Sequence, residues 1–238
     1  MVGLEVVNLH VRVSGREVVR GVSFSVPQGS VVAMMGPNGS GKSTLALSLA
    51  GHPRYEVVEG KILLNGEDVT ALKPEERARR GLFLGFQAPP ALEGVSVRAL
   101  LSAVLPAQGL EYSEDQVVRA LGKMALPPSY LERQVNVGFS GGERKRLEVA
   151  QALVLKPRVV VLDEPDSGLD VDGVRLLAVA LGELAGSGTG VLLITHNPMT
   201  VEIVRPQKVL VLVSGLIAAE GGVELARTIS EKGYPGAA

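Results

Sequence analysis

Three groups of residues in this chain have the types and spacing that phosphate chemistry needs. The first is a glycine-rich run after the apolar stretch 31–35, and it fits the phosphate-loop pattern G-x-x-x-x-G-K-[ST]. The run comprises Gly36, Pro37, Asn38, Gly39, Ser40, Gly41, Lys42 and Ser43, with Thr44 directly after it. Glycines leave backbone N–H groups free to surround phosphate oxygens, and the helix that begins near Lys42 adds its positive end. By itself the run predicts a nucleotide site, with a plain glycine turn between strand and helix as the alternative.

The second group is a pair of adjacent carboxylates, Asp163 and Glu164, at the end of the apolar run 159–163. Buried carboxylates cost free energy unless they bind something. We expect Asp163 to hold Mg²⁺ through water, together with the hydroxyl of Ser43. Glu164 would polarise the attacking water, while Lys42 would reach the β- and γ-phosphates. The pair therefore predicts phosphoryl transfer to water.

The third group lies between the other two and consists of Phe139, Ser140, Gly141, Gly142 and Glu143. Serine followed three residues later by glutamate is a capping box, which would merely begin a helix. The two glycines weaken a first helical turn, so they favour a backbone that must approach something closely. A bare helix N-terminus near a ligand is an anion site. Both interpretations of this group can hold together.

In this order, the three groups resemble the ATP-binding-cassette (ABC) ATPases. The resemblance implies an α/β cassette with a phosphate-loop core and mostly parallel sheet, an N-terminal antiparallel β subdomain and an α-helical subdomain. It also implies ATP and Mg²⁺ as ligands and an ATP-dependent homodimer. In that dimer, Ser140 and Gly142 would contact the γ-phosphate bound by the other subunit.

Three more residues match positions of that family. Gln87, after the apolar run 82–86, resembles the glutamine that senses Mg²⁺ and the γ-phosphate. His196 ends another apolar run and resembles the switch histidine that contacts the γ-phosphate. Asp170 is expected to be the N-cap of the next helix, and by the resemblance it also belongs to the loop that crosses the dimer seam. The other two histidines, His10 and His52, we interpret as structural.

Two stretches narrow the resemblance further. Phe139 and Glu143 stand where transporter cassettes commonly carry Leu and Gln, and Asp166, Ser167 and Gly168 replace the usual Thr-Ser-Ala run. With these features the whole chain resembles the SufC family, the soluble ATPases of the SUF iron–sulfur cluster assembly machinery. The resemblance implies SufB and SufD as partners, with ATP-driven dimerisation remodelling their scaffold. The alternative is the ATP-binding subunit of an ABC membrane transporter, and a non-enzymatic binding module is disfavoured by Glu164 and His196.

Together with the pattern of apolar runs, the resemblance implies a single ABC ATPase domain over residues 1–238. Residues 1–90 and 137–238 would form the β-subdomain and catalytic core, and residues 91–136 the α-helical subdomain. The runs 4–13 and 18–26 predict an antiparallel hairpin. Further strands are expected at 31–35, 61–64, 159–163, 191–195 and 208–213, and a helix at 44–50. Strands alternating with helices favour a mostly parallel sheet with phosphates at its carboxyl edge.

Composition excludes several classes of function. The formal net charge is −1 and aromatic residues make up 3%, which disfavours nucleic-acid binding. The chain has no cysteine, so it forms no disulfide and supplies no thiolate ligand; a cluster would sit on a partner. No apolar stretch is long enough for a membrane helix, and the N-terminus lacks the pattern of a signal peptide. We expect a cytoplasmic protein, at most peripheral to a membrane.

Three segments outside the motifs give further hypotheses. The basic run 144–146 is either a solvated face, or its Lys145 holds Glu164 away from water until the dimer forms. Segment 88–95 is either an ordinary hinge or an edge that grips a partner helix. ABC cassettes often stack adenine on an aromatic residue of the N-terminal hairpin. Here Val13 falls near that place and no aromatic residue occurs before Phe24, so we expect weaker ATP binding and poor discrimination between ATP and GTP.

Overall fold

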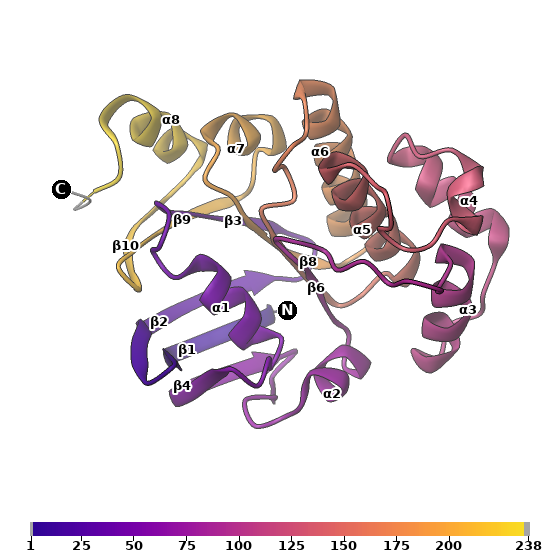
Figure 1. Cartoon of the computed structure of the whole chain (residues 1–238). Coiled ribbons are helices and arrows are strands. Elements are labelled where there is room, and N and C mark those ends of the chain that lie inside the picture. Colours follow the sequence, from indigo (N-terminus) through magenta and orange to yellow (C-terminus); the bar gives the residue numbers. More distant parts are fainter. Residues whose placement is uncertain (1, 236–238) are drawn as a thin grey trace.

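The computed structural model describes residues 2–235 and contains a six-stranded and a four-stranded β-sheet (Figure 1). The larger sheet is formed by β3 (Val31–Met35), β6 (Leu82–Gly85), β7 (Val159–Asp163), β8 (Gly190–Ile194), β9 (Lys208–Val213) and β10 (Leu216–Gly221). Its strand order is β10-β9-β3-β8-β7-β6. All neighbours pair in parallel except β10, which runs antiparallel to β9 at the edge. The predicted mostly parallel sheet is confirmed, with β8 beginning one residue earlier than expected.

The central strands are apolar on both sides because the sheet is covered on both faces. In β7, Val159 and Val161 belong to one hydrophobic cluster, and Val160 and Leu162 belong to the other. Successive side chains of a strand point to opposite faces, so a strand buried on both faces reads as a continuous apolar run. This is why the runs in the sequence located these strands so closely.

The smaller sheet has the order β2-β1-β4-β5 and is antiparallel throughout. Its strands are β1 (Val2–Val13), β2 (Arg16–Pro27), β4 (Tyr55–Leu64) and β5 (Glu67–Asp68). The predicted N-terminal hairpin is confirmed. β4 begins well before the predicted 61–64, because residues 55–60 are largely half-buried or exposed and give no apolar run.

Helices fill the space around the sheets. They are α1 (Lys42–Leu49), α2 (Pro74–Arg79), α3 (Val97–Ala107), α4 (Glu114–Lys123), α5 (Gly141–Leu155), α6 (Val171–Gly186), α7 (Pro198–Val204) and α8 (Val223–Lys232), with a 3₁₀ turn, η1 (Pro128–Glu132). Leu45 and Leu49 of α1 share one cluster with both sheets. Helices α3 to α6 share another cluster with the opposite face of the six-stranded sheet (Figure 1). The sheet is thereby buried on both sides.

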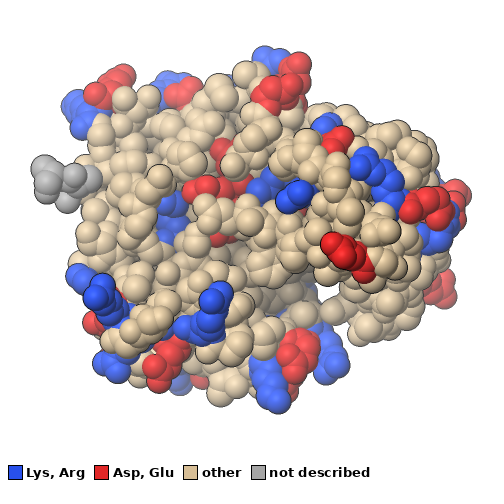
Figure 2. All heavy atoms as spheres, in the orientation of Figure 1, with Lys and Arg blue, Asp and Glu red and all other residues tan. Residues whose placement is uncertain are grey.

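The segment between Gln87 and Ser140 contains two helices and a 3₁₀ turn joined by loops. α3 includes Pro106 in its last turn, and η1 begins at Pro128. Within residues 2–235, no helix is both long and apolar enough to cross a membrane. Figure 2 shows acidic and basic side chains interspersed over the visible face, in keeping with the small net charge.

Candidate nucleotide-binding and catalytic site

The phosphate loop connects β3 to α1 and lies against β9. A Cβ atom on Gly36 would come within 2.2 Å of the Leu212 carbonyl oxygen, so no side chain fits there. Gly41, the N-cap of α1, has φ of 106°, a conformation that glycine adopts readily. Ser40 Oγ is buried and has no hydrogen-bond partner within the described residues. The glycines of this loop therefore serve close approach and a tight turn at the start of a helix.

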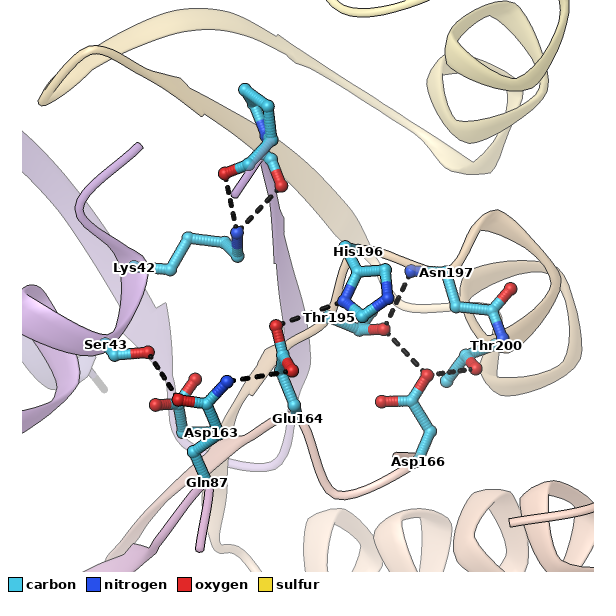
Figure 3. A network of polar contacts seen from close by, with 12 residues as sticks. Lys42, Ser43, Gln87, Asp163, Glu164, Asp166, Thr195, His196, Asn197 and Thr200 are labelled. Atoms are coloured by element: carbon cyan, nitrogen blue, oxygen red, sulfur yellow. Dashed lines mark hydrogen bonds and ion pairs between the residues drawn. The ribbon is translucent and has the colours of Figure 1, made fainter. Parts of the chain in front are cut away.

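Lys42 is folded back over the loop and is 5% exposed. Its ammonium group donates hydrogen bonds to the carbonyl oxygens of Gly36, at 2.8 Å, and Pro37, at 2.9 Å (Figure 3). An ammonium group has three N–H donors, so one remains for a phosphate oxygen. Burial lowers the pKa of Lys42, and the carboxylates of Glu164 and Asp163 oppose this change. The lysine is thus held in the loop by backbone carbonyls.

Glu164 lies where the chain leaves β7, and two predicted site residues hold its carboxylate. Gln87 Nε2 donates to Oε2 at 3.1 Å, and His196 Nδ1 lies 3.0 Å from Oε1 (Figure 3). Glu164 has φ of 50°, in the left-handed region that residues other than glycine seldom adopt. Its N–H donates to the Ile194 carbonyl, which stabilises this turn. Backbone strain of this kind is typical of functional positions.

The two carboxylates differ in proton affinity. Burial raises the pKa of Asp163; the nearby Glu164 adds to this, while the Ser43 hydroxyl and the Lys145 and Lys42 charges oppose it. Burial alone would also raise the pKa of Glu164. Hydrogen bonds from His196 and Gln87 outweigh it, and the net pKa lies below the usual value. Glu164 is therefore held as the ionised form in this arrangement.

The oxygen atoms expected to bind Mg²⁺ lie together at this edge. Ser43 Oγ is 3.5 Å from Gln87 Oε1, and Asp163 stands beside them (Figure 3). Asp163 is buried, and its Oδ1 has no hydrogen-bond partner within residues 2–235. A hydroxyl, an amide oxygen and a carboxylate suit Mg²⁺, which is usually held by few protein oxygens plus phosphates and water. The residues present fit the predicted ion.

One pocket gathers most of the residues predicted to act within a single chain, while Asp163, Gly36, Pro37 and Ser40 are not part of its lining. Its lining consists of Val18, Asn38, Gly39, Gly41, Lys42, Ser43, Thr44, Gln87, Glu164 and His196. Val13, placed near the base by counting along the chain, is not part of this lining; Val18 of β2 is. The hairpin turn lies between these two residues, and counting along the chain does not show which strand faces the loop. Neither phenylalanine, tyrosine nor tryptophan occurs among these described lining residues.

Ser140, Gly142 and Asp170 are absent from that lining. Ser140 begins α5 with a complete capping box, in which Ser140 N donates to Glu143 Oε2 and Glu143 N to Ser140 Oγ. Asp170 caps α6 by accepting a hydrogen bond from Gly173 N at 2.7 Å. The capping interpretations of both segments are therefore present in the structure. Their contacts across a dimer remain predictions.

Sequence reasoning missed the role of Asp166. Its Oδ2 accepts hydrogen bonds from the hydroxyls of Thr195, at 2.8 Å, and Thr200, at 2.6 Å, and all three residues are buried (Figure 3). Thr195 directly precedes His196. The loop after Glu164 is thus tied to the loop that carries the histidine. In the sequence, this role was indicated only by the position of Asp166, a polar residue two positions after the carboxylate pair.

Both hypotheses for Lys145 are wrong. The residue is 4% exposed, so it is not part of a solvated face. Its ammonium donates to the carbonyl oxygens of Phe86 and Asp163, and Glu164 is paired with His196 instead. The helical rotation turns Lys145 inward, away from the neighbouring arginines. A run of basic residues in the sequence does not reveal this rotation.

Comparisons with known proteins agree with this geometry. A family model described as "ABC transporter" matches residues 19–167, and an AAA domain model matches residues 133–202. The chain is 37% identical to vegetative protein 296 of Bacillus subtilis (strain 168), over 97% of this chain and 91% of that protein. It is 41% identical to the probable ATP-dependent transporter ycf16 of Cyanophora paradoxa, over 97% and 93%. A solved ATP-binding subunit of an ABC transporter superposes with a TM-score of 0.82 at 28% identity, covering 98% of this chain and 95% of that one.

Proposed function

We propose that this chain drives conformational change of a SufB–SufD scaffold during iron–sulfur cluster assembly. The chain belongs to the ABC transporter family of ATP-binding proteins and is an ATPase that uses ATP and Mg²⁺. The proposal rests on the two stretches in which this sequence departs from transporter cassettes, because one residue of each stretch makes buried contacts in the structure. Asp166 is buried under two threonine hydroxyls. Phe139 is buried with the Arg133 guanidinium 4.1 Å from its ring centre. Both residues are therefore held in place by contacts within the folded chain.

For hydrolysis, we assign each residue of the pocket one task. Lys42 and the N–H groups of the phosphate loop bind the β- and γ-phosphates. Ser43, Asp163 and Gln87 would hold Mg²⁺, which neutralises charge that develops on the phosphates. Glu164 accepts a proton from the water whose oxygen attacks the γ-phosphorus, as the bond to the ADP oxygen breaks. His196 contacts the γ-phosphate.

The contacts of Glu164 add a control to this scheme. Gln87 and His196 hold the Glu164 carboxylate, and both have tasks at the nucleotide. When they turn to Mg²⁺ and the γ-phosphate, the Glu164 carboxylate loses these two hydrogen bonds and is free to accept one from the attacking water.

We further propose that Ser140 and Gly142 complete the site of a second subunit. Their absence from the pocket of their own chain supports this, because the glycine backbone at the start of α5 then has no phosphate to bind within it. Dimerisation of ATP-binding domains is a property of the family. ATP and Mg²⁺ would drive it here.

The partner is expected near Phe86, which precedes Gln87 and is 39% exposed. Phe86 lines an apolar cleft with Leu47, Leu82 and Leu84. In segment 88–95, by contrast, Leu92 is half-buried and packs against the main helical core. Substitution of Leu92 would damage the fold, so Phe86 is the better residue to test.

The experiment is detergent-free co-purification of this chain with co-expressed SufB and SufD. We expect a stable complex on size-exclusion chromatography, weakened by Phe86→Asp and unaffected by Val179→Asp, a control at a position that is 69% exposed on α6. Both variants should still bind ATP. Failure to bind SufB and SufD, together with co-purification of an integral membrane subunit in detergent, would establish the transporter alternative, which the name of the Cyanophora relative favours.

A further inference from the structure

Two buried charged residues of α5 enclose the peptide groups of Phe86. Lys145 is 4% exposed and Glu148 is 6% exposed, and they lie one helical turn apart on the same face. Glu148 Oε1 accepts a hydrogen bond from Phe86 N at 2.7 Å, and Lys145 Nζ donates to Phe86 O at 2.5 Å. Gln87 is the next residue of the chain. Both backbone groups before Gln87 are therefore fixed by one helix.

Lys145 also reaches the second strand of the site. Its ammonium donates to the carbonyl oxygen of Asp163 at 3.0 Å. Glu148 has space beside the end of β6 because residue 85 is glycine: a Cβ there would lie 3.1 Å from Glu148 Oε2 and 2.6 Å from Leu162 Cδ2. The arrangement needs a glycine, a lysine and a glutamate at once.

Burial of two charged side chains is costly, and an apolar pair would cover the ends of the strands more cheaply. What apolar side chains cannot do is bind the N–H and C=O groups that β6 leaves unpaired where it ends. Lys145 and Glu148 supply partners to both groups of Phe86. The cost is therefore matched by fixed positions for Gln87 and for the backbone of Asp163.

We propose that Lys145 and Glu148 are positioning residues that fix Gln87 and Asp163 to α5, so that the Mg²⁺ site and the start of α5 move together. The same helix begins with Ser140 and Gly142, so a contact with the ATP of a second subunit would be transmitted to the Mg²⁺ ligands of this one. The transmission rests on the proposed contact between subunits. The positioning of Gln87 and Asp163 does not.

The test is the Mg²⁺ dependence of nucleotide binding, measured with a fluorescent ATP analogue on the full chain. Glu148→Met removes the acceptor for Phe86 N, and we expect the Mg²⁺ concentration for half-maximal binding to rise about tenfold, the scale of one lost hydrogen bond to a charged group. Glu148→Gln keeps an acceptor oxygen and should restore the wild-type value. Lys145→Met should also raise the value.

Val149→Ala is the matched control, because it removes core volume from the same helix and keeps Glu148, which accepts the hydrogen bond from Phe86 N. It should lower the melting temperature and leave the Mg²⁺ dependence unchanged. If Glu148→Met behaves like Val149→Ala, the two charged residues are structural and the proposal is wrong. Sedimentation velocity with ATP then tests transmission: Glu148→Met should need about tenfold more Mg²⁺ to dimerise. Binding of SufB and SufD is a separate measurement, so its failure leaves this result interpretable.

Discussion

The phosphate loop edge and the beginning of α5 satisfy their polar groups in different ways. At the loop edge, Ser40 Oγ and Asp163 Oδ1 are buried without a hydrogen-bond partner in the described part of the chain. At the start of α5, Ser140 and Glu143 form hydrogen bonds with each other, and the Tyr130 hydroxyl donates a hydrogen bond to Glu143. The first region leaves polar atoms to be matched by a ligand. The second pairs the polar groups of its capping box with one another, although Asn136 Oδ1, shortly before it, is buried without a partner within residues 2–235.

Aromatic contacts make the second region rigid as well. The Arg133 guanidinium lies 4.5 Å from the ring centre of Tyr130 and 4.1 Å from that of Phe139, and the two rings meet edge to face. Arg133 also donates to the Gly138 carbonyl. Contacts of this kind contribute about 0.5–1 kcal/mol each. The loop before Ser140 is thus held in place without a nucleotide.

The difference between the two regions indicates that one binds a ligand and the other is presented to another molecule. A region with unpaired buried polar groups is one that binds, and its own chain supplies the catalytic groups around it. A helix start whose capping groups are paired with one another, with glycines at its tip, is one that can be presented to another molecule. The proposed pairing of one chain's pocket with the other chain's α5 follows from this contrast.

The largest expected effect tests the catalytic region. Glu164→Gln should lower the turnover number for ATP by about 10²-fold or more, because an amide cannot accept the proton of the attacking water. Nucleotide binding should persist, whereas Lys42→Ala should weaken binding itself. Phosphate release and fluorescence titration measure the two quantities. Hydrolysis by Glu164→Gln at the wild-type rate would mean that another group is the base.

The next effect tests the contrast between the regions directly. Lys42→Ala disables the pocket, and Ser140→Arg disables the start of α5 by blocking close approach. Each variant alone should be almost inactive. A mixture should regain activity, since each heterodimer contains one pocket and one α5 that are both intact. If mixing restores no ATPase activity at any ratio, either the two regions act within one chain or the two sites are coupled too strongly for one intact site to work. Crosslinking the start of α5 to the phosphate loop of the other chain distinguishes these two outcomes.

The smallest effect concerns stability and Glu148. Burial raises the pKa of Glu148 to about 7; the Phe86 N–H and Lys145 oppose the change, and Asp163 adds to it. A carboxyl with a raised pKa in the folded state stabilises the fold fully below its unfolded pKa, near 4.5, and this contribution is lost as the pH rises through about 7. From pH 5 to pH 8 the wild type loses this contribution and Glu148→Gln does not. The free energy of unfolding of Glu148→Gln relative to the wild type should therefore rise by on the order of 1–3 kcal/mol.

Urea denaturation at the two pH values measures this difference, with Glu183→Gln on the exposed side of α6 as the control. An equal difference at both pH values would show that Glu148 keeps an ordinary pKa in the folded protein.

The sequence by itself located the candidate catalytic edge. Gln87, Asp163 and His196 each follow an apolar run, and the carboxyl ends of neighbouring parallel strands meet at one edge of the sheet. Because strand periodicity and the phosphate-loop pattern are local, the pocket, its lysine and its oxygen ligands could be anticipated without coordinates. The start of α5 could also be anticipated as a capping box.

Tertiary structure alone decided the partners of buried polar residues. Lys145 belongs to a basic run in the sequence, yet it binds the backbone of Phe86 and Asp163. Asp166 marks the family resemblance, yet it binds Thr195 after β8 and Thr200 of α7. Val18 rather than Val13 faces the pocket. A residue type states which hydrogen bonds a side chain can make, but the atom that meets it is brought by another element. That choice depends on how helices and strands far apart in the chain pack together.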